Sequence, residues 1–157
     1  MQSTNQAQIS GSLPTLRRGS QGDDVKYLQR LLNDFLASNL TIDGDFGQKT
    51  EAAVKQAQEF FSLKVDGIVG SKTWYYLIAY TNPASLPTLR RGSTGDAVKF
   101  LQERLSQIGY SLVADGSFGA KTEAAVKQFQ KDCGLTVDGI VGSKTWTAMF
   151  VSEEGGC

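Results

Sequence analysis

The sequence predicts an all-α protein built from two tandem three-helix bundle modules. A nine-residue pattern occurs four times, with the shared core apolar residue, Asp-Gly, variable residue, apolar residue, Gly, variable residue, Lys-Thr. A longer stretch, Leu13–Ser20, returns letter for letter at Leu86–Ser93. Good helix formers or apolar runs follow each pattern. A short motif nested in a longer repeat therefore predicts two copies of one helical module.

The four copies of the pattern span residues 42–50, 65–73, 114–122 and 137–145. In each copy the Asp carboxylate is expected to accept a backbone N–H two residues on, and the Gly to adopt a positive φ. The next apolar residue, Phe46 or Val69 in the first module, is expected to anchor the turn in the core. The second Gly is an acceptable N-cap, so each copy predicts a turn that starts a helix.

The repeat divides the chain into five segments. They are an extended or disordered arm at 1–12, module 1 at 13–80, a linker at 81–85, module 2 at 86–151 and a flexible tail at 152–157. A period of about 70 residues is too long for one solenoid unit and fits two small domains. The linker is too short to let the modules move far apart.

The first helix of each module follows a Gly-Ser-x-Gly stretch. Apolar residues recur there at helical spacing: Val25, Leu28 and Leu32 in module 1, and Val98, Leu101 and Leu105 in module 2. The second helix exchanges a large and a small residue between the modules. Module 1 has Ala57 and Phe61 where module 2 has Phe129 and Cys133. Because cores tolerate swaps that conserve volume, all four are predicted to face inward.

Composition argues against several classes of function. The formal net charge is zero and no basic patch stands out, which disfavours nucleic-acid binding. No run of 18 apolar residues suggests a membrane span, and residues 1–11 have no apolar core of a secretory signal in the chain as given. Histidine is absent, which removes the commonest catalytic base and metal ligand.

No catalytic site, metal site or cofactor is predicted. The two cysteines cannot form a structural zinc site alone, and no Ser-His-Asp or Cys-His set exists. Cys133 is interpreted as a buried structural thiol, with a disulfide to Cys157 as the alternative. The stretch 67–73 has the wrong glycine spacing for a phosphate-binding loop. Asp43 and Asp45 lack the remaining ligands of a calcium loop.

Three ordered signatures carry a family resemblance. They lie at Gly19–Gln29, Asp43–Gln58 and Val65–Trp74, and they return at Gly92–Gln102, Asp115–Gln130 and Val137–Trp146. Together they resemble the three-helix peptidoglycan-binding domain of cell-wall hydrolases. One departure is Ala57, where the family usually has an aromatic residue.

The resemblance implies a non-enzymatic targeting module that binds bacterial cell-wall peptidoglycan, through either its glycan strand or its peptide stem. It also implies a location in the cell wall, in the periplasm or outside the cell. A wall hydrolase or another protein acting in trans is a further expected partner. The alternative interpretation is a protein-interaction or assembly module that keeps the fold without binding glycan.

Recognition of peptidoglycan would need cations for carboxylates and aromatic faces for sugars or methyl groups. The candidate ligand-binding residues are Arg17, Arg18, Lys49, Tyr75, Tyr76, Arg90, Arg91 and Lys121. Arginine is well shaped for carboxylate binding. Core packing is the preferred interpretation for Tyr27, Phe100, Trp74 and Trp146. Thr147 and Ala148 replace the two tyrosines in module 2, so if those rings bind ligand, module 2 is expected to bind more weakly or differently.

Overall fold

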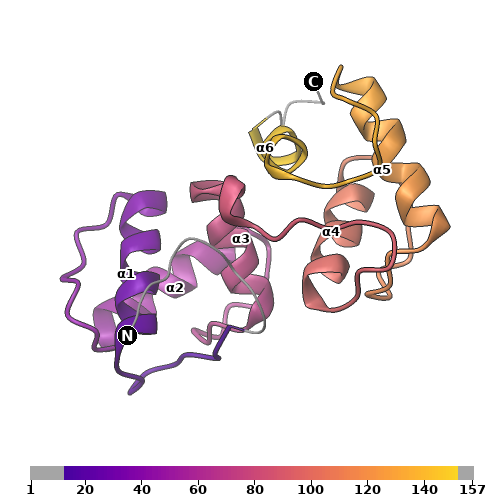
Figure 1. Cartoon of the computed structure of the whole chain (residues 1–157). Coiled ribbons are helices and arrows are strands. Elements are labelled where there is room, and N and C mark those ends of the chain that lie inside the picture. Colours follow the sequence, from indigo (N-terminus) through magenta and orange to yellow (C-terminus); the bar gives the residue numbers. More distant parts are fainter. Residues whose placement is uncertain (1–12, 152–157) are drawn as a thin grey trace. The chain divides into compact units, whose positions relative to one another are not determined.

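The computed structural model describes residues 13–151, in which the helices of both modules are joined by loops and turns (Figure 1). Module 1 contains α1 (Asp23–Leu36), α2 (Gln48–Phe60) and α3 (Ser71–Thr81). Module 2 contains the 3₁₀ helix η1 (Pro83–Ser85), α4 (Asp96–Gln107), α5 (Ala120–Asp132) and α6 (Ser143–Val151). The predicted all-α class with three helices per module is confirmed. The arm predicted at 1–12 and the tail predicted at 152–157 lie outside the described residues.

The chain divides into two compact units after Thr81, within the segment predicted as a linker. Residues 83–85 are not simply a spacer, because they form η1 and η1 packs against α6. Most of the predicted linker is therefore structured as part of the second unit.

All four Asp-Gly turns form as predicted. The carboxylates of Asp43, Asp66, Asp115 and Asp138 accept the N–H two residues on at 2.9, 2.9, 3.0 and 2.9 Å. The following glycines have φ of 79°, 74°, 79° and 74°, a region that side chains with a Cβ rarely adopt. The helices α2, α3, α5 and α6 each begin directly after the second glycine of the pattern.

The core of each module consists of the apolar residues that the sequence patterns predict. Phe46 and Val69 are buried behind their turns, and so are their counterparts Phe118 and Val141. Val25, Leu28, Leu32, Val98, Leu101 and Leu105 are all fully buried. Trp74 and Trp146 are also fully buried, which confirms their interpretation as core residues.

The predicted size swap on the second helix is confirmed for three of its four members. Ala57, Phe61 and Phe129 are buried. Cys133 is only half-buried, because it follows the last residue of α5 at the edge of the module. It is disulfide-bonded, so the prediction of a buried free thiol is wrong. The alternative pairing with Cys157 involves a residue outside the described part of the chain.

A buried glutamine side chain holds each turn in place. Gln29 donates from Nε2 to Asp43 Oδ1, Asp45 O and Thr50 Oγ1, at 3.2, 3.1 and 3.1 Å, and its Oε1 accepts the Gly44 N–H at 3.0 Å. The same arrangement, here called a glutamine bridge, recurs at Gln58, Gln102 and Gln130. Each of the four glutamines is only 1% exposed. A glutamine bridge thus joins one helix, the turn after it and the threonine in the first turn of the next helix.

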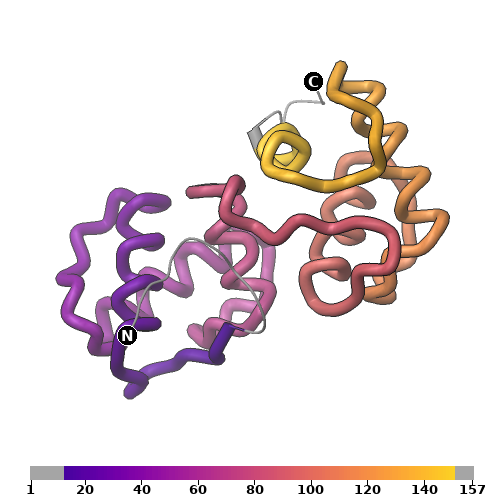
Figure 2. The backbone as a smooth tube through the Cα atoms, in the orientation of Figure 1, coloured from indigo at the N-terminus to yellow at the C-terminus, as the bar shows by residue number. Residues whose placement is uncertain are grey.

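Two further contacts close each module around its N-terminal segment. In module 1 the backbone of Leu16 pairs with that of Val69, and the Trp74 indole N–H donates to the Pro14 carbonyl at 2.7 Å. Figure 2 shows the segment before α1 lying beside the loop before α3. In module 2 Leu89 pairs with Val141, and Trp146 donates to the Pro87 carbonyl at 2.9 Å. The repeated Leu-Pro stretch therefore belongs to the folded module.

Replacing a bridging glutamine should destabilise its module strongly. Gln58→Ala leaves the Gly67 N–H, the Asp66 N–H and the Thr73 hydroxyl without their buried partner. We expect the free energy of unfolding of module 1 to fall by about 3 kcal/mol. Urea unfolding of the full chain, followed by circular dichroism and tryptophan fluorescence, measures this change. The matched control is Gln56→Ala, an exposed position on the same helix, for which about 0.5 kcal/mol or less is expected. Equal losses for the two variants would contradict a structural role for the bridge.

The four turns should also make stability depend on pH. Backbone N–H groups, with the bridging glutamines, hold the pKa values of Asp43, Asp66, Asp115 and Asp138 below their ordinary range. A carboxyl whose pKa is lower in the folded state contributes stability above its unfolded pKa, and this contribution is lost as pH falls through the folded pKa. We therefore expect stability to be level near neutral pH and to fall below about pH 4.

The measurement for this prediction is urea unfolding at a series of pH values. In a variant with Asn at all four turn positions, the free energy of unfolding should fall much less at acid pH. The Asn amide still accepts the turn hydrogen bond but does not titrate. Replacing the exposed acids Asp23 and Asp96 by Asn is the control. If the fourfold variant loses as much stability at acid pH as the parent chain, other carboxyl groups cause that loss.

Candidate functional site

The four predicted arginines lie on the surface at the loop before the first helix of each module. Arg17, Arg18, Arg90 and Arg91 are all exposed. Arg18 Nη1 contacts Glu51 Oε1 at 2.9 Å, and Arg91 Nη1 contacts Glu123 Oε1 at 2.8 Å. The arginine side chains of these pairs remain 55% and 58% exposed. Exposed pairs of this kind contribute little to stability, so both guanidinium groups stay accessible to an anionic ligand.

The two predicted lysines occupy the second position of the helix that follows the first turn of each module. Lys49 and Lys121 are both exposed. In module 1 the Arg18–Glu51 pair brings Arg18 to the first turn of α2, the turn that also carries Lys49. The corresponding pair brings Arg91 to the first turn of α5. The structure thus places Arg18 with Lys49, and Arg91 with Lys121, around the same helix starts. Arg90 instead acts on Asp138, in the turn before α6.

The predicted aromatic residues lie elsewhere. Tyr75 and Tyr76 are 7% and 4% exposed, and the Tyr76 ring stacks on Phe61 with ring centroids 5.1 Å apart. Neither ring offers an open face to a ligand in this structure. Tyr27 is half-buried and stacks on Trp74 at 5.6 Å, and Phe100 is buried and stacks on Trp146 at 5.8 Å. The packing of Tyr27 and Phe100 agrees with their interpretation as core residues.

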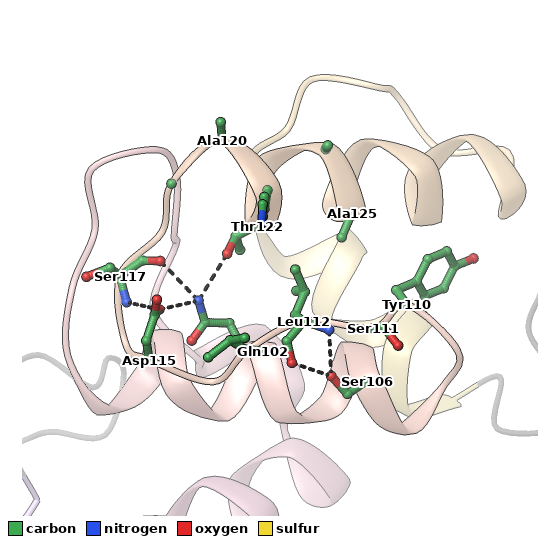
Figure 3. A pocket seen from close by; sticks show the side chains of 14 residues that line it. Gln102, Ser106, Tyr110, Ser111, Leu112, Asp115, Ser117, Ala120, Thr122 and Ala125 are labelled. Atoms are coloured by element: carbon green, nitrogen blue, oxygen red, sulfur yellow. Dashed lines mark hydrogen bonds between the residues drawn. The ribbon is translucent and has the colours of Figure 1, made fainter.

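Module 2 contains an open hollow of about 910 Å³ between α4, the loop after α4 and the start of α5 (Figure 3). We call this feature the module 2 hollow. Its lining residues are Gln102, Ser106, Tyr110, Ser111, Leu112, Val113, Asp115, Ser117, Gly119, Ala120, Lys121, Thr122, Ala124 and Ala125. Among the sequence-predicted site residues, Lys121 is the one that lines it.

Hydrogen bonds shape the floor and one end of the hollow. The Gln102 bridge ties Asp115, Ser117 and Thr122 together at the start of α5. Farther along α4, the Ser106 hydroxyl accepts the Leu112 N–H and donates to the Leu112 carbonyl, both at 3.1 Å (Figure 3). The loop that borders the hollow is therefore attached to α4 at two points.

Tyr110 lies at the other end of the hollow and is held by α5. Its hydroxyl donates to Asp132 Oδ2 at 2.5 Å, and Gln128 donates to Asp132 Oδ1 at 2.9 Å. The Tyr110 ring packs edge-on against Phe129 with centroids 6.0 Å apart. Burial and the Asp132 carboxylate raise the pKa of Tyr110 to about 12. The hydrogen bond from Tyr110 in turn lowers the pKa of Asp132.

The described surface offers no evident metal centre. No group of three or more Cys, Asp or Glu side chains suited to a metal ion occurs in residues 13–151. Within the same residues, no helix is both long enough and apolar enough to cross a membrane.

Sequence reasoning missed the glutamine bridges and the hollow. The bridges had a readable signal, because a threonine follows every Asp-Gly turn at the same spacing and a glutamine lies on the helix before each turn, at positions that match between the two modules. The hollow had no such signal, since it depends on how one loop folds against α4 and α5.

Comparison with known proteins assigns both modules to one family. Residues 21–77 and 94–149 each match the family model described as "Putative peptidoglycan binding domain". One relative is the N-acetylmuramoyl-L-alanine amidase CwlL of Bacillus licheniformis, 42% identical over 95 residues, covering 57% of this chain and 26% of the relative. Another is the zinc D-Ala-D-Ala carboxypeptidase of Streptomyces albus G, 41% identical over 115 residues, covering 71% of this chain and 41% of the relative.

Solved structures show similar local matches. A peptidoglycan-binding protein from Clostridioides difficile, crystallised with glutamine hydroxamate, is 44% identical with a TM-score of 0.40, covering 41% of this chain and 40% of that chain. The chain spans between a quarter and a half of the length of the two curated relatives described above.

The Tyr110–Asp132 pair gives a direct test of the geometry at the hollow. Asp132→Asn removes the charge that favours the neutral phenol, so the pKa of Tyr110 should fall from about 12 part of the way toward 10.0, with burial supplying the remainder. Ring-carbon NMR of the full chain across an alkaline titration measures this shift, and Asp96→Asn on α4 is the control. An unchanged Tyr110 titration in Asp132→Asn would contradict the described pairing.

Proposed function

The chain belongs to the peptidoglycan-binding domain family, and we propose that its two modules bind bacterial cell-wall peptidoglycan without catalysing a reaction on it. The observation that carries the proposal is the tandem match. Each matched range includes all three α-helices of its module at least in part, together with both Asp-Gly turns. The two matched ranges together cover most of residues 13–151.

The state of the repeated acids supports a non-catalytic role. Hydrolysis of a sugar bond by paired carboxyl groups needs one acid with a raised pKa. The repeated Asp43, Asp66, Asp115 and Asp138 instead have lowered pKa values and each accepts hydrogen bonds within its own turn. These four carboxylates therefore serve the fold.

The exposed cations before the first helix and at the start of the second helix of each module are the proposed contacts to the wall polymer. Arg17, Arg18 and Lys49 supply positive charge in module 1, and Arg90, Arg91 and Lys121 supply it in module 2. Peptidoglycan carries carboxylates on its peptide stems, and arginine and lysine both pair with carboxylates. The buried rings of Tyr75 and Tyr76 are left out of the proposed surface.

Two modules on one chain also favour binding to a polymer with many identical sites. Once one module is bound, the second meets a nearby site at an effective concentration in the millimolar range, so two weak sites reinforce each other. We place the protein at the cell wall, in the periplasm or outside the cell, where it could hold a wall hydrolase in place in trans.

One surface feature favours a second candidate, a protein-interaction role for module 1. Phe60 is 65% exposed at the end of α2, and its ring lies edge-on to Phe35 and Tyr80 at 5.1 and 6.1 Å. Module 2 has Asp132 at the position of Phe60. If this aromatic group serves a protein partner, Phe60→Ser should leave wall binding unchanged.

Co-sedimentation with washed bacterial sacculi tests the proposed function. We expect the full chain to pellet saturably and to resist moderate salt, and the double variant Arg18→Ala, Arg91→Ala to bind about fivefold more weakly, because each module loses a carboxylate partner. The double variant Arg30→Ala, Lys99→Ala removes the same charge from exposed positions on α1 and α4 and is the control. Dye release from labelled sacculi, measured in parallel, should be absent.

Three results would count against the proposal. Pelleting no greater than that of an unrelated neutral protein would favour the protein-interaction candidate. Equal losses for the two double variants would show that only net charge matters. Dye release that a carboxyl substitution abolishes would identify an enzyme.

A further inference from the structure

Small or short apolar side chains form part of the wall of the module 2 hollow, beside polar residues that include Ser111 and Ser117. Ala120, Ala124 and Ala125 line it from α5, and Leu112 and Val113 line it from the loop after α4. Figure 3 shows Ala120, Ala125 and Leu112 among these residues. Val113 is 77% exposed, so its side chain is open to a ligand. A wall of this composition suits a ligand that carries methyl groups and other small apolar substituents.

Charged groups of both signs accompany these apolar walls. Lys121 has no carboxylate partner among the described residues. Asp115 uses Oδ1 for the Gln102 and Ser117 hydrogen bonds, while its Oδ2 accepts none among residues 13–151. A ligand complementary to the hollow would therefore carry a carboxylate and an amine beside small apolar groups.

The hollow offers little open aromatic surface on which a sugar ring could stack. Its one aromatic lining residue is Tyr110, whose hydroxyl is bonded to Asp132 and whose ring packs edge-on against Phe129. N-acetyl sugars carry no formal charge, so they would not use Lys121 or Asp115. The peptide stem has carboxylates, amines and small side chains, so its chemistry matches the hollow better than that of the glycan strand.

We propose that the module 2 hollow binds the peptide stem of peptidoglycan, with Lys121 as the counter-ion of a stem carboxylate and the alanine-lined wall of α5 packed against the stem's small side chains. This inference rests on the proposed function and names the part of the polymer that one module recognises.

The corresponding residues of module 1 differ, so the assignment is to module 2. Ala37 stands where module 2 has Tyr110, Gln48 where it has Ala120, and Thr41 where it has Val113. The loop of module 1 is also one residue longer. Lys49 and Ala52 keep the positions of Lys121 and Ala124, which provides matched controls.

The test is an amide NMR titration of the full chain with two soluble probes. The peptide probe is Nα-acetyl-Lys-D-Ala-D-Ala, and the sugar probe is a tetramer of β-1,4-linked N-acetylglucosamine. We expect the peptide to shift the backbone amides of residues 119–125 saturably, and the sugar to leave them unmoved. Lys121→Ala should weaken peptide binding about fivefold, and Lys99→Ala should not. Amidating the peptide carboxylate should weaken binding to the parent chain. Because Lys121 is proposed to pair with that carboxylate, the same amidation should weaken binding to Lys121→Ala markedly less. An equal loss of affinity in the two proteins would contradict the pairing.

A steric pair of variants tests the location. Ala124→Leu narrows the hollow from an exposed position on α5 and should weaken peptide binding, while Ala52→Leu at the matching position of α2 should not. A stronger effect of Ala52→Leu would overturn the assignment to module 2.

The two proposals fail separately. If the peptide does not shift residues 119–125, or the sugar does, the stem assignment is wrong, and the proposed function stands as long as the parent chain pellets with sacculi. If the parent chain does not pellet, the proposed function fails as well.

Discussion

The buried glutamine bridge is the interaction on which each module depends. One amide group satisfies the carboxylate of a turn, a backbone carbonyl, a backbone N–H of the turn and the hydroxyl in the first turn of the next helix. A polar group buried without such partners would cost free energy, so the glutamine and the turn are tolerated only together. Four bridges occur in the described residues, one for each turn, and they determine where four of the helices begin.

Much of the fold could be predicted from the sequence because its determinants are local. An Asp-Gly pair implies a turn through its own side chain and its positive φ, and the apolar residue after it implies an anchor. The role of Gln29 or Gln58 could not be predicted in the same way, since a glutamine on a helix is usually solvated. Only the recurrence of glutamine before each turn distinguishes these residues from exposed ones such as Gln56.

The candidate site was less predictable than the fold. Arg18 and Lys121 could be chosen by residue type and by their place beside a turn, but the hollow arises from one loop of module 2. The shape of that loop depends in part on the Tyr110–Asp132 contact, which no repeat reveals because module 1 has Ala37 and Phe60 at these positions. The Ser106–Leu112 contact does have a counterpart in module 1, where the Asn33 side chain bonds the backbone of Leu40. Tyr76 was predicted to bind ligand, but its ring stacks on Phe61 in the core. Phe61 is the large residue of the size swap in module 1, so the sequence of module 2 gives no sign of this contact.

The tryptophan that closes each module bears on the order in which the chain folds. Bridge contacts such as Gln58–Thr73 join residues 15 apart, whereas Trp74 and Pro14 are 60 apart. Loop-closure entropy grows only with the logarithm of loop length, so the longer closure costs roughly 1 kcal/mol more than the shorter one. Helices and turns can therefore assemble through short-range contacts, with the Leu-Pro segment docking on the tryptophan last.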